Sequence, residues 1–311
     1  MQFVVKIFNI KSIQLIIAAL IILGAVFCIF TPNYFLFKWG ESFAVQIMFG
    51  YLAAGIIFLM FRMPRLMFTS FACCAGLAMY LKDASNGNLI YPARTNGPVI
   101  EVANFNVSSA GDDFMATIEQ IIETDADVIS VQEIDPNWDK VLKEALVTEY
   151  PYSATVFRPV DFLGIGIFSK SPLIDIDTFY YQDIPNLKFK TQIENRDIDF
   201  LSAYIYPELN SKDYKHTQAH FNTLCSILSS EQKNPFITLG DFNEVQWSAY
   251  VRDFRKQCHL NDSRRFPTWV ERPTDHIFYT NQLECVGFKS IRASNAEHFG
   301  IKGTYQFKPI H

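Results

Sequence analysis

A carboxylate and an amide stand two residues apart where an apolar segment of this chain ends. The run Pro235–Leu239 is short and apolar, which predicts a buried strand. Gly240 lets the backbone turn sharply after it, so Asp241 and Asn243 would lie at the mouth of a sheet. There the carboxylate can accept a proton from water, and the amide can orient that water. The same residue types also suit an ordinary strand-ending turn, so this motif alone leaves both interpretations open.

Four more strand-like segments carry polar side chains near an end. They span 102–107, 127–133, 274–278 and 294–299, and they supply Asn106, Glu133, Asp275, His276, Glu297 and His298. Sheets of α/β proteins tend to place their sites at strand ends. The five segments together therefore predict one site.

In this order, the Asn, Glu, Asp-x-Asn, Asp-His and acid-His motifs resemble those of the endonuclease/exonuclease/phosphatase superfamily. The resemblance covers about Val99 to Phe307 and includes the segment 164–173. Trp247-Ser248 and Pro267-Thr268-Trp269 are similar to a membrane-tethered bacterial branch of that superfamily. The resemblance implies an α/β domain over 99–311, with two packed β-sheets flanked by helices in a four-layer sandwich.

The resemblance also implies hydrolysis of a phosphoester with the help of a divalent metal. Phosphodiesters resist attack, so the reaction needs charge neutralisation and an activated water. Hard oxygen ligands favour Mg²⁺ or Mn²⁺. Glu133 is the first candidate for the metal ligand, with Asn106 and Asp275 beside it. The structural alternatives are that Glu133 caps the next segment and that Asn106 satisfies strand backbone.

The remaining site residues follow from the same resemblance. Asp241 is the candidate general base, and Asn243 would orient the water or bind the scissile phosphate. His298 would stabilise the charge on the phosphate, and His276 would join it in binding the substrate.

Two positions depart from the family pattern. Glu297 stands where the family has aspartate before the histidine, one methylene longer. Tyr204 stands where many members have histidine, although apurinic endonucleases of the exonuclease III type carry tyrosine in a similar setting. Its phenol either donates to the phosphate or leaving group, or simply packs its ring on the strand.

Three apolar runs predict transmembrane helices over 12–30, 43–61 and 66–81. A helix needs about 20 apolar residues to span a bilayer, and Lys or Arg can extend from the ends of a shorter one. A signal peptide would account for the first run only, and no small-residue cleavage site follows it. Residues 1–82 would then form a membrane region, and 83–98 a linker.

Basic residues set the expected orientation in the membrane. Lys6 and Lys11 precede the first run, and Arg62 and Arg65 separate the second from the third. The positive-inside rule then places the N-terminus in the cytoplasm. We expect a multi-pass protein of the cytoplasmic (inner) membrane with an extracytoplasmic catalytic domain.

The charge of the domain limits its partners. From Asp83 onward the chain has 31 acidic and 21 basic residues, a net charge of −10, so it lacks the general basic surface of nucleic-acid-binding proteins. One basic cluster lies between the Asp-x-Asn and Asp-His motifs. It is either an ordinary exposed segment or a phosphate-binding rim. It comprises Arg252, Arg255, Lys256, Arg264, Arg265 and Arg272.

Cysteine spacing shows no metal-ligand pattern. A Cys258–Cys285 disulfide would suit an extracytoplasmic domain, although a buried free thiol is the commoner state for any one of these residues.

The favoured function is a membrane-integrated phosphohydrolase acting on nucleic acid, a phospholipid headgroup or a small phosphoester, with no protein partner inferred. The alternative is a membrane-bound binding module that keeps the fold without catalysis.

Overall fold

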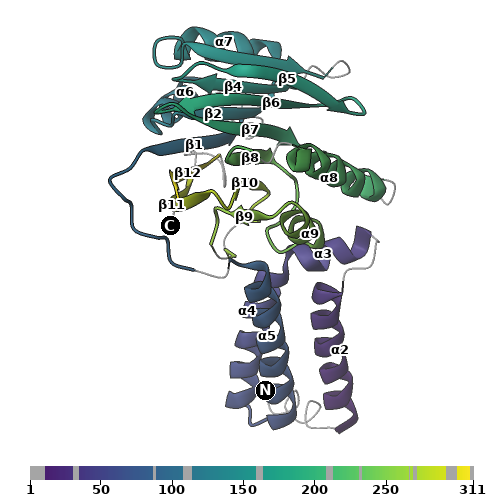
Figure 1. The fold of residues 1–311 in the computed structure, drawn as a ribbon. Helices are drawn as coiled ribbons and strands as arrows, with labels where there is room; N and C mark the ends of the chain where they lie inside the picture. The colour runs from purple at the N-terminus through teal and green to yellow at the C-terminus, as the bar shows by residue number, and fades with distance from the viewer. Residues whose placement is uncertain are drawn as a thin grey trace.

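The computed structural model describes residues 11–30, 35–86, 89–107, 114–158, 164–207, 213–230, 233–265, 267–268, 272–291 and 300–308. It consists of a two-sheet domain and a group of helices that projects from one end of it (Figure 1). The first sheet has the strand order β11-β12-β1-β2-β4-β3, and the second has the order β5-β6-β7-β8-β10-β9.

The strands are β1 (Val99–Asn106), β2 (Val128–Ile134), β3 (Tyr152–Phe157), β4 (Gly164–Ser169), β5 (Ile174–Tyr181), β6 (Ile184–Ile193), β7 (Arg196–Tyr204), β8 (Phe236–Asp241), β9 (Leu260–Asp262), β10 (Asp275–Thr280), β11 (Leu283–Ile291) and β12 (Gly300–Phe307). The helices of the domain are α6 (Phe114–Glu123), α7 (Pro136–Leu146), α8 (Asp213–Ser230) and α9 (Ala249–Gln257). The N-terminal helices are α2 (Lys11–Ile29), α3 (Phe35–Ser42), α4 (Ala44–Met60) and α5 (Pro64–Ala84).

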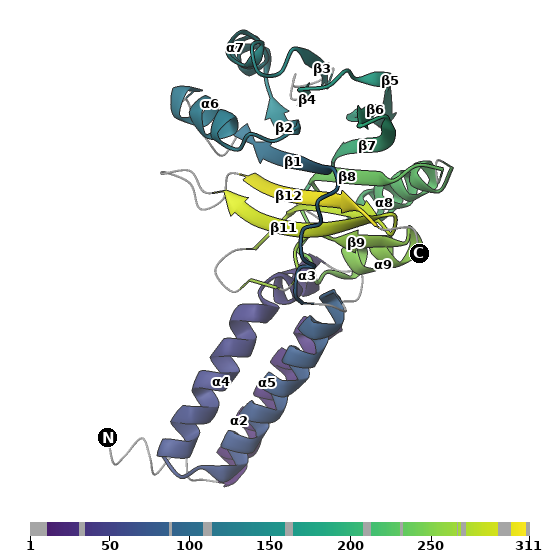
Figure 2. The same cartoon turned by 60° about the vertical axis from the view of Figure 1, so that its left-hand side comes forward.

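Three apolar layers hold the domain together. Residues such as Val102, Phe200 and Leu239 fill the space between the two sheets. Helices α6 and α7 cover the outer face of the first sheet, with Trp138 and Leu142 in the layer beneath them. Helices α8 and α9 cover the second sheet in the same way. Figure 2 shows these layers from the side, and they confirm the expected four-layer α/β sandwich.

Periodic apolar residues predict helices over 113–124, 136–149 and 216–229. Helices α6, α7 and α8 lie there, because each buries its apolar stripe on a sheet. Strands β5 and β6 were not predicted. The burial pattern of β5 shows why, since most of this edge strand is exposed and lacks a regular alternation.

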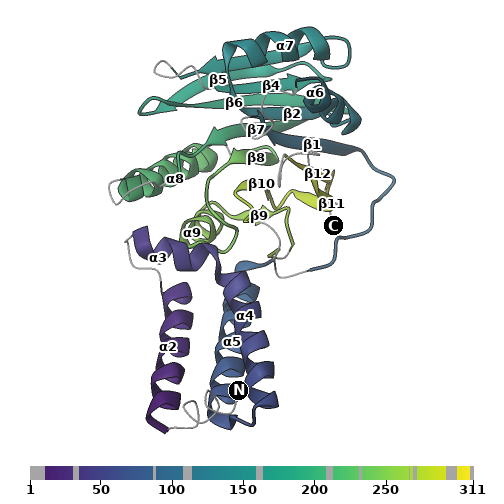
Figure 3. The same ribbon diagram turned by 180° about the vertical axis from the view of Figure 1, so that it is seen from behind.

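Helices α2 and α5 are each long and apolar enough to cross a membrane, and α4 is an apolar helix of 17 residues. Their bounds lie within three residues of the predicted spans. Figure 3 shows all three projecting from the domain in the same direction. The short helix α3 was not predicted, and it lies between the upper ends of these helices and the domain (Figure 1).

The segment after Asp241 packs against the N-terminal helices. Trp247 is fully buried there in a cluster with Tyr80 and Leu81 of α5. Its indole Nε1 donates to the Glu41 carbonyl of α3 at 2.7 Å, and the Tyr80 hydroxyl donates to the Trp247 carbonyl at 2.9 Å. The Glu41 carboxylate accepts the Ala249 amide at 2.9 Å at the start of α9. The helices and the domain therefore share one packed interface.

The structure corrects the cysteine expectation. Cys225 of α8 and Cys258 at the end of α9 form a disulfide, with 5.5 Å between their Cα atoms. Cys285 remains a buried free thiol, and burial raises its pKa to about 11. Sequence spacing could not choose between these pairings, because the packing of α8 against α9 decides which cysteines meet.

Candidate active site

Four strand ends and one strand start meet at one edge of the domain. Strands β1 and β2 run parallel, with Asn106 beside Gln132, and β7 and β8 run parallel, with Tyr204 beside Asp241. Strand β10 runs antiparallel to β8, so its first residue, Asp275, lies beside the last residue of β8, Asp241. The two sheets therefore present their polar ends together.

Asn106 joins two candidate carboxylates directly. Its Nδ2 donates to Glu133 Oε1 at 2.9 Å and to Asp241 Oδ2 at 3.1 Å. Asp275 is 2% exposed, and its Oδ1 accepts Asn104 Nδ2 at 3.0 Å. Asn106, Glu133 and Asp241 thus form one hydrogen-bonded group, with Asp275 on the neighbouring strand.

Unusual backbone geometry turns these side chains toward the site. Gly240 has φ +149°, and a Cβ there would lie 1.8 Å from the Ala203 carbonyl oxygen, so only glycine fits. Glu133 has φ 58° and lies at a register shift between β2 and β4, which is a bulge that re-aims its side chain. Asn243 has φ 51°. Such conformations collect at functional sites, where the surrounding structure maintains them.

Hydrogen bonds hold the loop after β8 against β7. The amide of Asn243 donates to Asp241 Oδ1 at 2.9 Å, and its Nδ2 donates to the Ile205 carbonyl at 2.8 Å. Asn243 is therefore fixed beside Asp241, as a water-orienting or phosphate-binding role requires.

Burial and neighbouring charge both act on the titratable groups. Burial, together with the charge of Asp275, raises the pKa of Asp241 to about 7, although the Asn243 amide opposes this. Burial also raises the pKa of Tyr204 well above its usual range, helped by the Glu133 charge and by a hydrogen bond to that carboxylate. Tyr204 therefore packs its ring against the core between the sheets and makes a hydrogen bond with the Glu133 carboxylate through its hydroxyl.

A buried polar layer behind the site was missed from the sequence. Gln132 Nε2 donates to the Ser130 and Ser202 hydroxyls at 2.9 and 3.0 Å and lies 3.3 Å from Asn104 Oδ1. All four side chains are fully buried. Polar residues two apart on apolar strands, at 104 and 106 and at 130 and 132, were the available signal.

His276 does not lie where a substrate-binding residue would. It is 1% exposed, its Nε2 is 2.8 Å from the Glu244 carbonyl, and its Nδ1 is 3.7 Å from Asp262. Because side chains alternate along a strand, His276 points to the opposite face from Asp275. The expected substrate contact is corrected to a structural one that supports the loop after β8. Glu297 and His298 lie outside the described residues.

The basic cluster is not a continuous phosphate-binding rim. Arg255 donates to the Ala84 carbonyl and to Asn86, and Arg265 donates to the Cys285 carbonyl. Arg252 lies over the Tyr80 ring, and Arg264 lies over the Phe288 ring. These four arginines hold the linker, the helices and β11 to the domain. Arg272 is exposed and lies over Phe43 of the N-terminal helices.

The donor set suits a small hard cation. Across the described ranges, no three His, Cys, Asp or Glu side chains form a ready-made metal cluster. Mg²⁺ keeps several of its waters and is often held by only one or two carboxylates. Glu133, with the Asn106 amide beside it and Asp275 near, meets that smaller requirement through oxygen donors alone.

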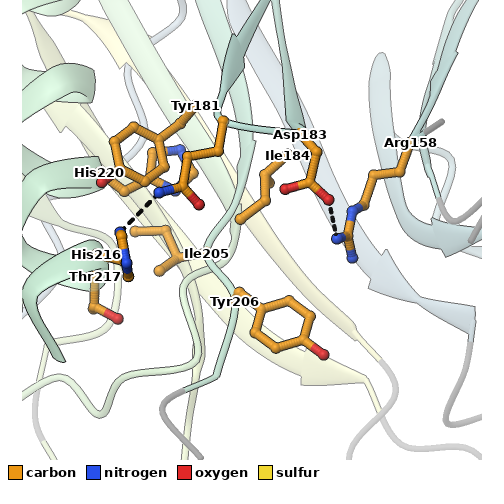
Figure 4. A pocket seen from close by; sticks show the side chains of 10 residues that line it. Arg158, Tyr181, Asp183, Ile184, Ile205, Tyr206, His216, Thr217 and His220 are labelled. Carbon is orange, nitrogen blue, oxygen red and sulfur yellow. Dashed lines mark hydrogen bonds and ion pairs between the residues drawn. The ribbon is translucent and has the colours of Figure 1, made fainter. Parts of the chain in front are cut away.

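A pocket adjoins these carboxylates. Arg158 lines a small crevice with Glu133 and Tyr204, and it also lines a pocket of about 140 Å³ between the β5–β6 turn and α8. Figure 4 shows Arg158 paired with Asp183 on one side of this pocket, with Tyr206 and His216 on the other sides.

The chain belongs to the endonuclease/exonuclease/phosphatase family, whose model matches residues 103–297. Members of this family hydrolyse phosphoester bonds. A search of curated proteins finds no match.

Solved structures of low identity share the fold. A Bacteroides thetaiotaomicron family protein is 17% identical with a TM-score of 0.57, over 69% of this chain and all of that one. The human Nocturnin catalytic domain is 16% identical with a TM-score of 0.57, over 68% and 96%. Danio rerio TDP2, in complex with a single-strand DNA product, is 13% identical with a TM-score of 0.55, over 67% and 99%.

Proposed function

We propose that this protein is a membrane-anchored, divalent-metal-dependent phosphohydrolase. The single observation that carries the proposal is the Asn106 bridge between Glu133 and Asp241, at the edge where β1, β2, β7 and β8 end. Family membership supports phosphoester chemistry, and the oxygen donors support Mg²⁺ or Mn²⁺. The substrate is a phosphodiester or phosphomonoester of nucleic acid, of a lipid headgroup or of a small molecule.

The roles of the residues follow from their contacts. When bound by Glu133, Asn106 and Asp275, the metal would supply charge neutralisation at the phosphate. Asp241 accepts the proton of the attacking water, and Asn243, fixed beside it, orients that water or the phosphate. Tyr204, kept protonated, donates to a phosphate oxygen or to the leaving group. His298 stabilises the developing charge, with Glu297 as its orienting acid.

The location in the cell is part of the proposal. The apolar helices α2, α4 and α5 form the membrane anchor. By the positive-inside rule, the basic residues near their ends put the domain outside the cytoplasm. The disulfide between Cys225 and Cys258 supports an extracytoplasmic domain, because disulfides persist in oxidising compartments.

The test is hydrolysis of bis-p-nitrophenyl phosphate by the full chain in detergent. We expect turnover with Mg²⁺ or Mn²⁺ and none with EDTA. Glu133→Gln should weaken the metal dependence, and Asp241→Asn should lower turnover by about 10²–10⁴-fold, the usual contribution of general acid–base catalysis. Glu149→Gln removes an exposed acid outside the site and serves as the matched control. Undiminished turnover in EDTA would refute the metal-dependent mechanism.

A further inference from the structure

An apolar groove opens between the N-terminal helices at the end nearest the domain. Its walls come from α2, α3 and α4, and it has a volume of about 690 Å³, within the range of ligand sites. Phe27, Trp39, Phe43, Ile47 and Tyr51 line it.

Two glycines let aromatic side chains of the groove pack directly against the helix backbones. Gly40 also lines it, and a Cβ at that position would lie 2.2 Å from the Phe27 ring. Gly24 lines it as well, and a Cβ there would lie 2.3 Å from the Tyr51 hydroxyl. Larger residues at these positions would force the aromatic rings to move.

The helices that form the groove also expose an apolar surface. Leu20 and Leu23 of α2 are 62% and 64% exposed, which is unusual for leucine unless another apolar phase covers it. Trp39 is 65% exposed at the domain end of the helices, where tryptophan marks the interface of a bilayer. The groove therefore lies at the level where lipid tails meet their headgroups.

A cation stands at the rim of the groove. The Arg272 guanidinium lies 4.9 Å over the Phe43 ring, which itself lines the groove. Arg272 is exposed and forms no ion pair with any of the described residues. It precedes Asp275 by three residues, so a phosphate at Arg272 would lie next to the segment that enters the site.

We propose that this groove binds one acyl chain of a phospholipid, with the lipid phosphate at Arg272. The apolar walls suit an acyl chain, and the exposed Arg272 guanidinium suits the anionic phosphate of the same lipid. This inference rests on the proposed function and narrows its substrate class to phospholipids, because Arg272 precedes Asp275 by only three residues in the chain. A second copy of the chain could also cover the apolar groove, but it would supply no anion for Arg272.

Native mass spectrometry of the full chain in detergent tests the proposal. EDTA is present so that turnover does not consume the lipid. Palmitoyl-oleoyl phosphatidylglycerol is added to the delipidated protein, and the diacylglycerol with the same chains is the phosphate-free comparison. We expect one tightly bound phosphatidylglycerol, and at least about ten-fold weaker binding of the diacylglycerol, since a hydrogen bond to a charged group contributes about 1.5–3 kcal/mol.

Two variants separate the tail site from the phosphate site. Ile47→Trp fills the groove and should abolish binding, whereas Ile57→Trp, on an exposed part of the same helix, should not. Arg272→Gln should weaken phosphatidylglycerol binding about ten-fold, whereas Lys289→Gln, at an exposed cation on β11, should not. If Ile47→Trp does not fold, Arg272→Gln still decides, because an exposed side chain is not needed for folding.

Equal binding by wild type and Arg272→Gln, or equal binding of the two lipids, would overturn the proposal. A dimer without bound lipid would show that a second copy occupies the groove and would overturn it too. Bis-p-nitrophenyl phosphate has no acyl chain, so its hydrolysis is tested independently. Failure of that hydrolysis refutes the proposed function, whereas failure of lipid binding refutes only the lipid inference.

Discussion

Removal of the Trp247 side chain should detach the loop after β8, residues 242–248, from the N-terminal helices. Trp247 is fully buried, and large-to-small substitution of such an aromatic residue costs about 3–5 kcal/mol. Trp247→Ala also removes the donor to the Glu41 carbonyl, which is buried in the interface. Trp247→Phe keeps most of the ring and loses only that donor, so we expect a smaller cost of about 1–3 kcal/mol.

Hydrogen exchange measures this loss directly, because the Ala249 amide donates across the interface to the Glu41 carboxylate. A cost of 3–5 kcal/mol corresponds to about two to four orders of magnitude in the opening equilibrium that governs exchange. The amides of residues 242–251 should therefore exchange much faster in Trp247→Ala. Hydrolysis of bis-p-nitrophenyl phosphate should fall as well, since Asn243 lies on the same loop.

Trp138→Ala is the matched control. Trp138 of α7 is 7% exposed and packs against the ring of Phe114 in the layer between the helices and the first sheet, away from the N-terminal helices. It should destabilise the domain without selectively exposing residues 242–251. Unchanged exchange in Trp247→Ala, or the same pattern in both variants, would refute the reasoning that the helices hold the loop.

Three further outcomes are expected. Gly240→Ala should abolish expression of folded protein in detergent or abolish turnover, because its Cβ would overlap the Ala203 carbonyl; normal expression and activity would contradict this close contact. Asp241→Asn should lower turnover of bis-p-nitrophenyl phosphate by about 10²–10⁴-fold without changing the fold, as seen by circular dichroism. Burial lowers the pKa of His220 to about 3, so its neutral form contributes stability that is present above pH 6.5 and is lost as the pH falls toward 3. Chemical unfolding measures the free energy of unfolding between pH 6.5 and 4. Its dependence on pH should be shallower by about 1.4 kcal/mol per pH unit in His220→Gln than in wild type.

The two-sheet fold was predicted through the family resemblance, which rests on distinct polar residues at the ends of short apolar strands. Those strand ends predicted Asn106, Glu133 and Asp241 as neighbours, and their hydrogen bonds confirm that they meet. Asp275 was predictable for the same reason, and its antiparallel register places it beside Asp241.

Other features depend on tertiary packing that no local pattern reports. His276 has the right neighbours in sequence, yet strand alternation turns it into the protein, toward the Glu244 carbonyl. The sequence left open whether the arginines after Asp241 form a phosphate-binding rim. In the structure Arg255 donates to the linker end of α5 and Arg265 donates to β11. Edge strand β5 gave no signal because little of it is buried.

The segment from Asp241 to Trp247 carries the candidate base at one end and the docking tryptophan at the other. A lysine of α3, Lys38, lies 3.5 Å from Glu244 in the middle of this segment and 3.2 Å from Glu41. The helices therefore contact the loop through apolar packing, hydrogen bonds and charge. A fragment that begins after α5 would expose the buried face of Trp247 and lose these contacts. The helices are thus part of the structure that positions the loop after β8, and activity must be measured on the whole chain.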